Sequence, residues 1–386
     1  MAHQEIRPLT SLRFFSASLI MIVHSTDILH EGHLRGILAL EHCVSFFFIL
    51  SGFILAYSYP SLNGTKAVGK FWFARICRIW PATIFSILLW AALLPWGLSG
   101  FSDYQKLAVF FTDILLLHSW IPSVTIANSL NSVTWSLSAE FFFYLLFPAL
   151  LHIFKMSWKW ALFCLISWIA IHFLLMLELD FITQRKFFDW FYYYNPSTRL
   201  FEFALGMFAY QFYKKFHAIK GSPFFWTIME ISALLLFIFN LWLCKHIFQL
   251  GLFQNNLIPI GLYIKHTGGA APSLILLILV FAFNRGWLSV ALSLPVIVLL
   301  GRISFALYLI HYLFITLYKL HLNEFSSNFS SWELNIAYWA ACLGAAYLLF
   351  TFIEEPCRRV LKKLGDYYLF NRSQSRPSTL SPSITR

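Results

Sequence analysis

The chain has 386 residues, of which 59% are hydrophobic and only 12% are charged, and its formal net charge is +11. A soluble protein carries roughly 25% charged residues, so this composition excludes an ordinary water-soluble domain. Apolar runs of the roughly 20 residues needed to cross a bilayer recur along the whole length. We therefore predict an all-α, polytopic membrane helix bundle.

About ten transmembrane helices are expected from these runs. They lie near 11–29, 37–58, 79–98, 134–154, 159–178, 199–216, 224–244, 270–284, 296–320 and 333–354. With ten crossings, the short loops rich in Lys and Arg all fall on one side of the membrane, so both termini are predicted to be cytoplasmic. This clustering explains the basic charge without a nucleic-acid partner.

Two segments are not expected to be ordinary membrane-spanning helices. Residues 103–120 are apolar enough to span, but one more crossing there would invert every later loop, so we expect a re-entrant or partly inserted segment. Residues 1–360 are predicted to form one transmembrane domain, and 361–386 a cytoplasmic tail that is largely disordered because its end is rich in Ser, Pro and Arg. The six cysteines form no C-x-x-C pair, so neither a disulfide nor a metal site is expected.

The first apolar run contains two ionisable residues, Arg13 and His24, at a spacing of eleven positions. In a helix this spacing returns both side chains to one face, roughly 16 Å apart along the axis. Asp27 follows three residues later, close to the same stripe. Ionisable groups are costly in hydrocarbon, so this face is expected to line a wet or protein-covered functional site.

Arg75 and Arg78 lie three positions apart beside the start of a predicted span. Two guanidinium groups on one helical face suit the phosphates of a nucleotide-like ligand. The alternative is positive-inside anchoring on anionic lipid, and the spacing alone favours neither interpretation.

Polar residues also share helical faces in three later spans. Ser136, Glu140 and Tyr144 follow an i, i+4, i+8 pattern. The carboxylate is predicted to handle a proton or to pair with a buried arginine. Arg199 and Glu202 form an i, i+3 pair that is more typical of a structural contact. Tyr308 and His311 share another face, where the histidine either contacts a ligand or bonds a neighbouring helix.

Taken together, these residues resemble the acyltransferase 3 family of integral membrane acyltransferases. The resemblance runs from about Ile6 to Arg359, with the motifs in the family's order. They are Arg13-x10-His24, FFFILSGF at 46–53, Arg75-x-x-Arg78 followed by IWP, WSLSAE at 135–140, RLFEFALG at 199–206, GRISFALYLIH at 301–311 and EEPCRR at 354–359. Trp80, where tyrosine is expected, and Ala139, where valine is commoner, are small departures.

The resemblance implies an O-acyltransferase that moves an acyl group, usually acetyl, from cytosolic acyl-CoA to a hydroxyl group. The acceptor would be a cell-surface or lipid-linked glycan, such as lipopolysaccharide, and the location a bacterial inner membrane with its lipid. Acyl-CoA is then the co-substrate, and no metal is required. The competing interpretation is a transporter or flippase of a lipid-linked sugar, which the lack of an internal repeat disfavours.

Roles for the candidate residues follow from acyl-transfer chemistry. His24 is the predicted base that removes the hydroxyl proton, although a transient acyl-imidazole is an open alternative. Arg13 would polarise the thioester carbonyl or hold the donor, and Glu140 would orient an imidazole or pair with Arg13. Arg75 and Arg78 would grip the CoA phosphates. The substrate-lining candidates are Asp27, Ser136, Tyr144, Tyr308 and His311.

Overall fold

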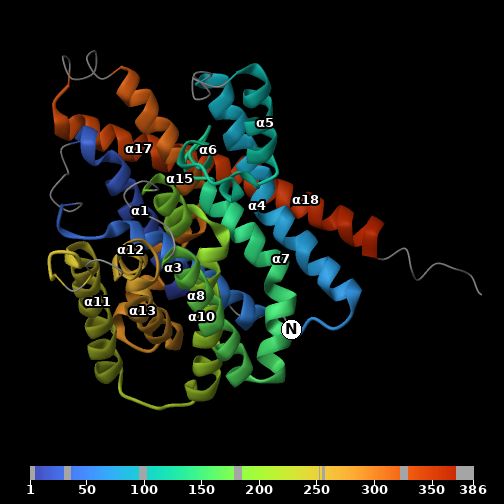
Figure 1. The fold of residues 1–386 in the computed structure, drawn as a ribbon, viewed down its shortest axis with the longest axis vertical. Helices are drawn as coiled ribbons and strands as arrows, with labels where there is room; N and C mark the ends of the chain where they lie inside the picture. The colour runs from blue at the N-terminus through green and yellow to red at the C-terminus, as the bar shows by residue number, and fades with distance from the viewer. Residues whose placement is uncertain are drawn as a thin grey trace, which may run out of the picture.

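The computed structural model describes residues 5–29, 36–94, 102–177, 185–251, 253, 257–321 and 329–370, and every regular element in those ranges is helical (Figure 1). This architecture confirms the predicted fold class. The long helices are α1 (Arg7–Leu29), α3 (Cys43–Ser58), α4 (Thr65–Leu93), α7 (Trp135–Met156), α8 (Trp158–Leu177), α10 (Pro196–Phe216), α11 (Pro223–His246), α15 (Pro295–Leu320) and α17 (Ser331–Leu349).

Shorter elements connect or extend these helices. They are α5 (Asp103–Ile114), α6 (Val124–Ala127), α9 (Arg185–Asp189), α12 (Ile258–His266), α13 (Ala271–Phe283), α14 (Trp287–Leu292) and α18 (Glu355–Gly365). The 3₁₀-helical turns are η1 (Leu40–His42), η3 (His118–Trp120) and η6 (Gly268–Ala270), and the π-helical segments are η4 (Trp190–Tyr194), η7 (Phe350–Glu354) and η8 (Asp366–Phe370). Residues 361–370 of the predicted tail are thus helical, and 371–386 lie outside the described residues.

Among the described residues, seven helices are long and apolar enough to cross a membrane, and the pair α12–α13, bent by 67°, raises the number to eight. The predicted count of ten is therefore not confirmed, although a helix occupies each of the ten predicted ranges. The two remaining predicted ranges are those of α1 and α10, which are not among the helices found long and apolar enough within the described residues. Within the spanning window, 72% of α3 and 61% of α15 are buried, against 17% of α8 and 28% of α11. The first two helices form the centre of the bundle, and the last two present apolar side chains outward, as lipid contact requires.

The closest helix packing in the centre joins α3 to α10, and glycines make it possible. A Cβ atom built on Gly52 would lie 1.9 Å from the carbonyl oxygen of Phe203, and one on Gly206 would lie 1.9 Å from that of Ile49. The two backbones therefore touch directly, as small residues allow in membrane helices.

The predicted structural pair Arg199 and Glu202 lies in the same region. Both side chains are fully buried, with Arg199 Nε 3.3 Å from Glu202 Oε2. The Arg199 guanidinium also donates to the carbonyl oxygen of His266 at 3.0 Å and to Ser45 Oγ at 3.3 Å. The hydrogen bonds of the Arg199 guanidinium therefore join α10 to α3 and to the end of α12.

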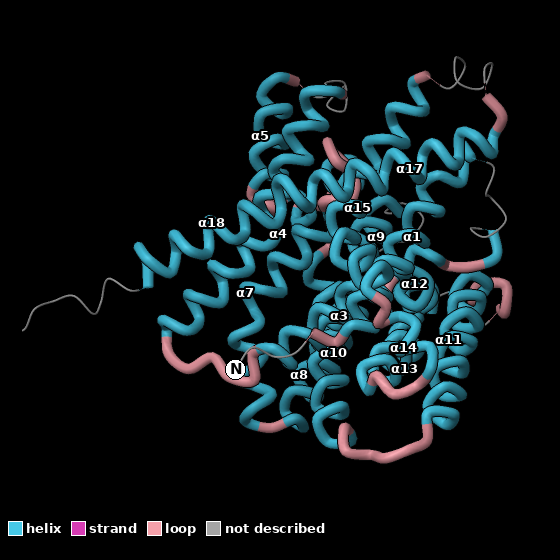
Figure 2. The backbone as a smooth tube through the Cα atoms, turned by 180° about the vertical axis from the view of Figure 1, so that it is seen from behind, coloured by secondary structure: helices cyan, strands magenta, loops and turns pink. Residues whose placement is uncertain are grey.

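The segment 103–120 does not form a helix long enough to cross a bilayer. Its helix α5 has 12 residues, or roughly 18 Å, and a turn and η3 follow it. Buried Asp113 and His118 form a pair with Oδ1 and Nδ1 3.1 Å apart, and Trp80 Nε1 donates to the Ile114 carbonyl at 2.7 Å. Figures 1 and 2 place α5 at one end of the molecule and the α10–α11 connection at the other.

Candidate active site

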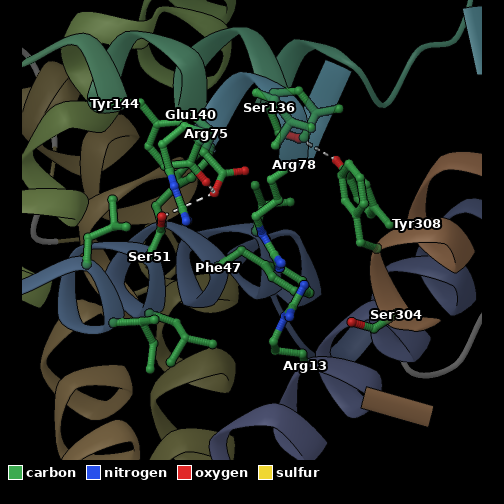
Figure 3. A pocket seen from close by; sticks show the side chains of 18 of the residues that line it. Arg13, Phe47, Ser51, Arg75, Arg78, Ser136, Glu140, Tyr144, Ser304 and Tyr308 are labelled. Carbon is green, nitrogen blue, oxygen red and sulfur yellow. Dashed lines mark hydrogen bonds between the residues drawn. The ribbon is translucent and has the colours of Figure 1, made fainter. Parts of the chain in front are cut away.

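A cavity of about 310 Å³ lies among α1, α3, α4, α7 and α15 (Figure 3). Seven of the ten predicted site residues line it: Arg13, Arg75, Arg78, Ser136, Glu140, Tyr144 and Tyr308. They come from four helices far apart in the sequence, and most of the remaining lining is apolar. An apolar cavity with a few convergent polar groups is typical of a small-molecule site.

Three arginines give this cavity its charge. Arg75 and Arg78 project from one face of α4, because three positions in a helix nearly complete a turn. Arg13 comes from α1, and its guanidinium group points toward that of Arg78 (Figure 3). Within the described ranges, none of the three forms an ion pair with a carboxylate. The cluster is therefore suited to binding an anion.

Arg75 is held in place mainly by aromatic rings. Its guanidinium carbon lies 5.6 Å from the ring centre of Tyr59 and 5.9 Å from that of Tyr144, and its Nη2 donates to the Tyr59 hydroxyl at 3.3 Å. These cation–π contacts orient the guanidinium, and no carboxylate among the described residues lies within ion-pair distance of it.

Glu140 projects from α7 and is fixed by two hydroxyl donors. Ser51 Oγ donates to its Oε1 at 3.1 Å, and the hydroxyl group of Tyr144, one turn along α7, donates to the same oxygen. These bonds orient the carboxylate at the wall of the cavity (Figure 3).

Ser136 and Tyr308 close the cavity between α7 and α15. Their hydroxyl oxygens lie 2.9 Å apart, and the Tyr308 oxygen lies 3.0 Å from the carbonyl oxygen of Val133. The ring of Phe47 packs against Tyr308 with ring centres 6.3 Å apart.

His24 and His311 lie together but do not line this cavity. His24 Nδ1 is 2.9 Å from His311 Nε2, and the two rings are nearly parallel, with an interplanar angle of 3°. His311 follows Tyr308 by one turn of α15, so the cavity wall and the histidine pair share one stretch of helix. The tenth predicted residue, Asp27, belongs to α1, but its side chain lies outside the described part of the structure.

Glu354 is a buried carboxylate near Arg13 and Arg78 to which the sequence analysis assigned no role. It is buried at the end of η7, with 4% of its surface exposed, and it interacts electrostatically with Arg78 and Arg13. A buried carboxylate beside this cluster lowers the repulsion between the arginines. The signal was present in the sequence, since an acidic residue closing an apolar run is expected to face the protein interior.

A smaller cavity of about 150 Å³ adjoins the first and shares Arg13 with it. Glu5 lies at its edge and pairs with Arg302, whose Nη2 is 2.6 Å from Glu5 Oε2. The Arg302 guanidinium lowers the pKa of the Glu5 carboxyl group below its ordinary value. This ion pair joins the segment before α1 to α15.

Comparison with known proteins identifies the family of the chain. The acyltransferase domain profile matches residues 8–354. The acyltransferase MdmB of Streptomyces mycarofaciens is 29% identical over 388 aligned positions, which cover 92% of each protein. Nodulation protein 10 of Rhizobium leguminosarum bv. viciae is 26% identical over 247 positions, covering 57% of this chain and 64% of that protein. No solved structure matches. The cavity thus belongs to a membrane-embedded acyltransferase, and the chain is a member of the acyltransferase 3 family.

Proposed function

We propose that this acyltransferase moves an acetyl group from acetyl-CoA to a hydroxyl group of a cell-surface or lipid-linked glycan at the bacterial inner membrane. The observation that carries the proposal is the convergence of Arg13, Arg75 and Arg78 on one cavity, with no carboxylate paired to them among the described residues. CoA is rich in phosphate, and guanidinium groups bind phosphate through charge-assisted hydrogen bonds.

The spacing along α1 supports donor binding at the arginine end of the site and catalysis at the His24 end. Arg13 lies with the arginine cluster, and His24 lies on the same face roughly 16 Å further along the helix. A donor whose phosphates bind Arg75 and Arg78 extends its long thiol-bearing arm away from the arginines, toward His24. Both termini are then cytoplasmic, and the acceptor approaches from the other side of the membrane.

The proposed reaction begins with His24 as general base. One imidazole nitrogen takes the proton of the acceptor hydroxyl, and the oxygen attacks the thioester carbonyl carbon. A C–O bond forms, the C–S bond breaks, and the CoA thiolate leaves and receives the proton. Arg13, at the other end of the site, helps to hold the donor beside Arg75 and Arg78. The products are the acetylated glycan and free CoA, and no metal takes part.

The first test measures transfer of radiolabel from [1-¹⁴C]acetyl-CoA to extractable glycan in membranes that contain the wild type or His24→Ala. Label should appear only with the wild type, because general base catalysis contributes roughly 10²- to 10⁴-fold. Equal label in both samples, at equal protein levels, contradicts the assignment of His24.

The second test concerns the donor site. Replacing both Arg75 and Arg78 by alanine should raise the KM for acetyl-CoA by at least about 10-fold, since each charged hydrogen bond contributes about 1.5–3 kcal/mol. Lys155→Ala, a basic residue in the last turn of α7 that does not line the cavity, is the control and should leave this KM unchanged. An unchanged KM in the double variant contradicts phosphate binding by these arginines.

A further inference from the structure

His311 is fully buried, and its hydrogen bonds determine where its protons are. Its Nδ1 lies 2.8 Å from the carbonyl oxygen of Tyr308 and 3.3 Å from that of Leu307, one turn earlier on α15. A carbonyl oxygen only accepts hydrogen bonds, so Nδ1 carries a proton. An imidazolium is costly in a buried position without a carboxylate, and none of these partners is acidic. His311 is therefore neutral, and its Nε2 is an acceptor.

This assignment fixes the protonation of the neighbouring ring. His24 Nδ1 is 2.9 Å from His311 Nε2. Because His311 Nε2 has a lone pair and no proton, His24 Nδ1 must donate the hydrogen bond. Because Nδ1 carries a proton, the neutral form of the His24 imidazole has its lone pair on the other nitrogen, Nε2.

We propose that His311 is a positioning residue that holds His24 in the tautomer with a proton on Nδ1 and a basic lone pair on Nε2. The inference rests on the proposed function, because the lone pair matters only if His24 removes the acceptor's proton. It assigns that step to His24 Nε2, with His311 accepting a hydrogen bond from the ring throughout. Partners that fix the ring orientation of a metal-bound histidine commonly contribute about 10- to 100-fold to activity, and we expect an effect of similar size here.

The packing around the pair supports a fixed ring orientation. The ring of Tyr312 meets His24 edge-on with ring centres 5.2 Å apart, and the ring of Trp90 stacks on that of Tyr312 with ring centres 5.8 Å apart. α1 and α15, which supply the two histidines, pack extensively along their length. The imidazole of His24 is thereby held between His311 and Tyr312, and a flip of its ring would break the bond to His311.

The kinetic test compares His311→Leu with His311→Gln in the full-length protein in membranes, with [1-¹⁴C]acetyl-CoA as donor. Leucine removes the acceptor atom, whereas the glutamine carbonyl oxygen places an acceptor near the position of Nε2. We expect His311→Leu to lower kcat by about 10- to 100-fold with an unchanged KM for acetyl-CoA, and His311→Gln to restore most of the rate. Wild-type kcat in the leucine variant, or equal losses in both variants, would overturn the proposal.

A spectroscopic test on the wild-type protein is independent of turnover. Wild-type protein labelled with ¹⁵N-histidine in lipid bilayers should show both rings protonated on Nδ1. Among the signals of the chain's 13 histidines, those of His24 and His311 are identified by their loss in His24→Ala and His311→Leu. A proton on His24 Nε2 overturns the proposal. Label transfer that survives His24→Ala contradicts the role of His24 as the base, whereas no label transfer with the wild type contradicts the proposed function, and the ring protonation is read separately from both results.

Discussion

Glu230 is a fully buried carboxylate on α11, in an apolar run where the sequence gives no hint of a partner. Its oxygens accept hydrogen bonds from the backbone N–H groups of Gly286 and Leu288 at 3.1 and 3.0 Å and from Ser289 Oγ at 2.5 Å. These donors belong to the first turn of α14, whose N–H groups have no partner within the helix. The Glu230 side chain thus accepts the hydrogen bonds that the first turn of α14 cannot make within its own helix.

We predict that Glu230→Leu lowers the free energy of unfolding by about 3 kcal/mol, because several buried donors lose their acceptor. Glu230→Gln should cost less, since its amide oxygen still accepts. Thermal unfolding of the purified protein in detergent measures both effects. Glu333→Leu is the matched control, because Glu333 caps α17 through Ser330 in an exposed position and its loss should cost about 1 kcal/mol. Equal stability of Glu230→Leu and the wild type contradicts the capping role.

For single residues, helical spacing predicts which side chains share a face but not which distant residues they contact. The helical spacing of Arg13, Arg75, Arg78, Glu140 and Tyr308 was sufficient to select residues that line one cavity. The contact of His24 with His311 joins positions 287 residues apart, and no local pattern reveals such a pair. The same holds for Glu230, whose partners lie on a different helix.

At the scale of elements, the contact of α3 with α10 depends on two glycines. Gly206→Ala should lower the free energy of unfolding by about 3 kcal/mol, because the added Cβ meets the backbone of α3 and the helices must separate. Thermal unfolding in detergent again measures the loss. Gly344→Ala on α17 is the control, since nothing lies within 4 Å of its added Cβ, and it should not destabilise the protein. A Gly206→Ala variant as stable as Gly344→Ala contradicts the close packing.

Helix positions were largely predictable because apolar runs have the length of a bilayer crossing. The positions where helices break could not be predicted from the sequence, because they depend on tertiary contacts. The bend between α12 and α13 occurs at Thr267, whose hydroxyl donates to the backbone of Tyr192 on a distant element. The segment after α4 folds back around the buried pair of Asp113 and His118, and hydropathy alone does not distinguish this arrangement from a crossing.

At the scale of the whole molecule, the orientation in the membrane remains a prediction that labelling can check. Lys66, in the first turn of α4, and Tyr104, beyond the other end of that helix, are both exposed. Because α4 has 29 residues, or roughly 43 Å, its two ends should lie on opposite sides of the bilayer.

The experiment introduces Lys66→Cys or Tyr104→Cys into protein whose exposed Cys164 and half-buried Cys357 are replaced by serine. In intact cells, a membrane-impermeant maleimide should label the variant at 104 but label the variant at 66 only after lysis. The parent without either added cysteine is the control. Labelling of both positions in intact cells contradicts the predicted topology.

The direct backbone contact at Gly52 and Gly206 has a mechanical consequence for the whole enzyme. Helices that touch backbone to backbone neither slide nor part without losing that contact, so α3 and α10 behave as one rigid wall. α3 supplies one side of the cavity, and α4, α7 and α15 supply much of the rest. Any widening that admits a bulky donor must therefore come from movement of α4, α7 and α15. The side of the site formed by α3 stays fixed.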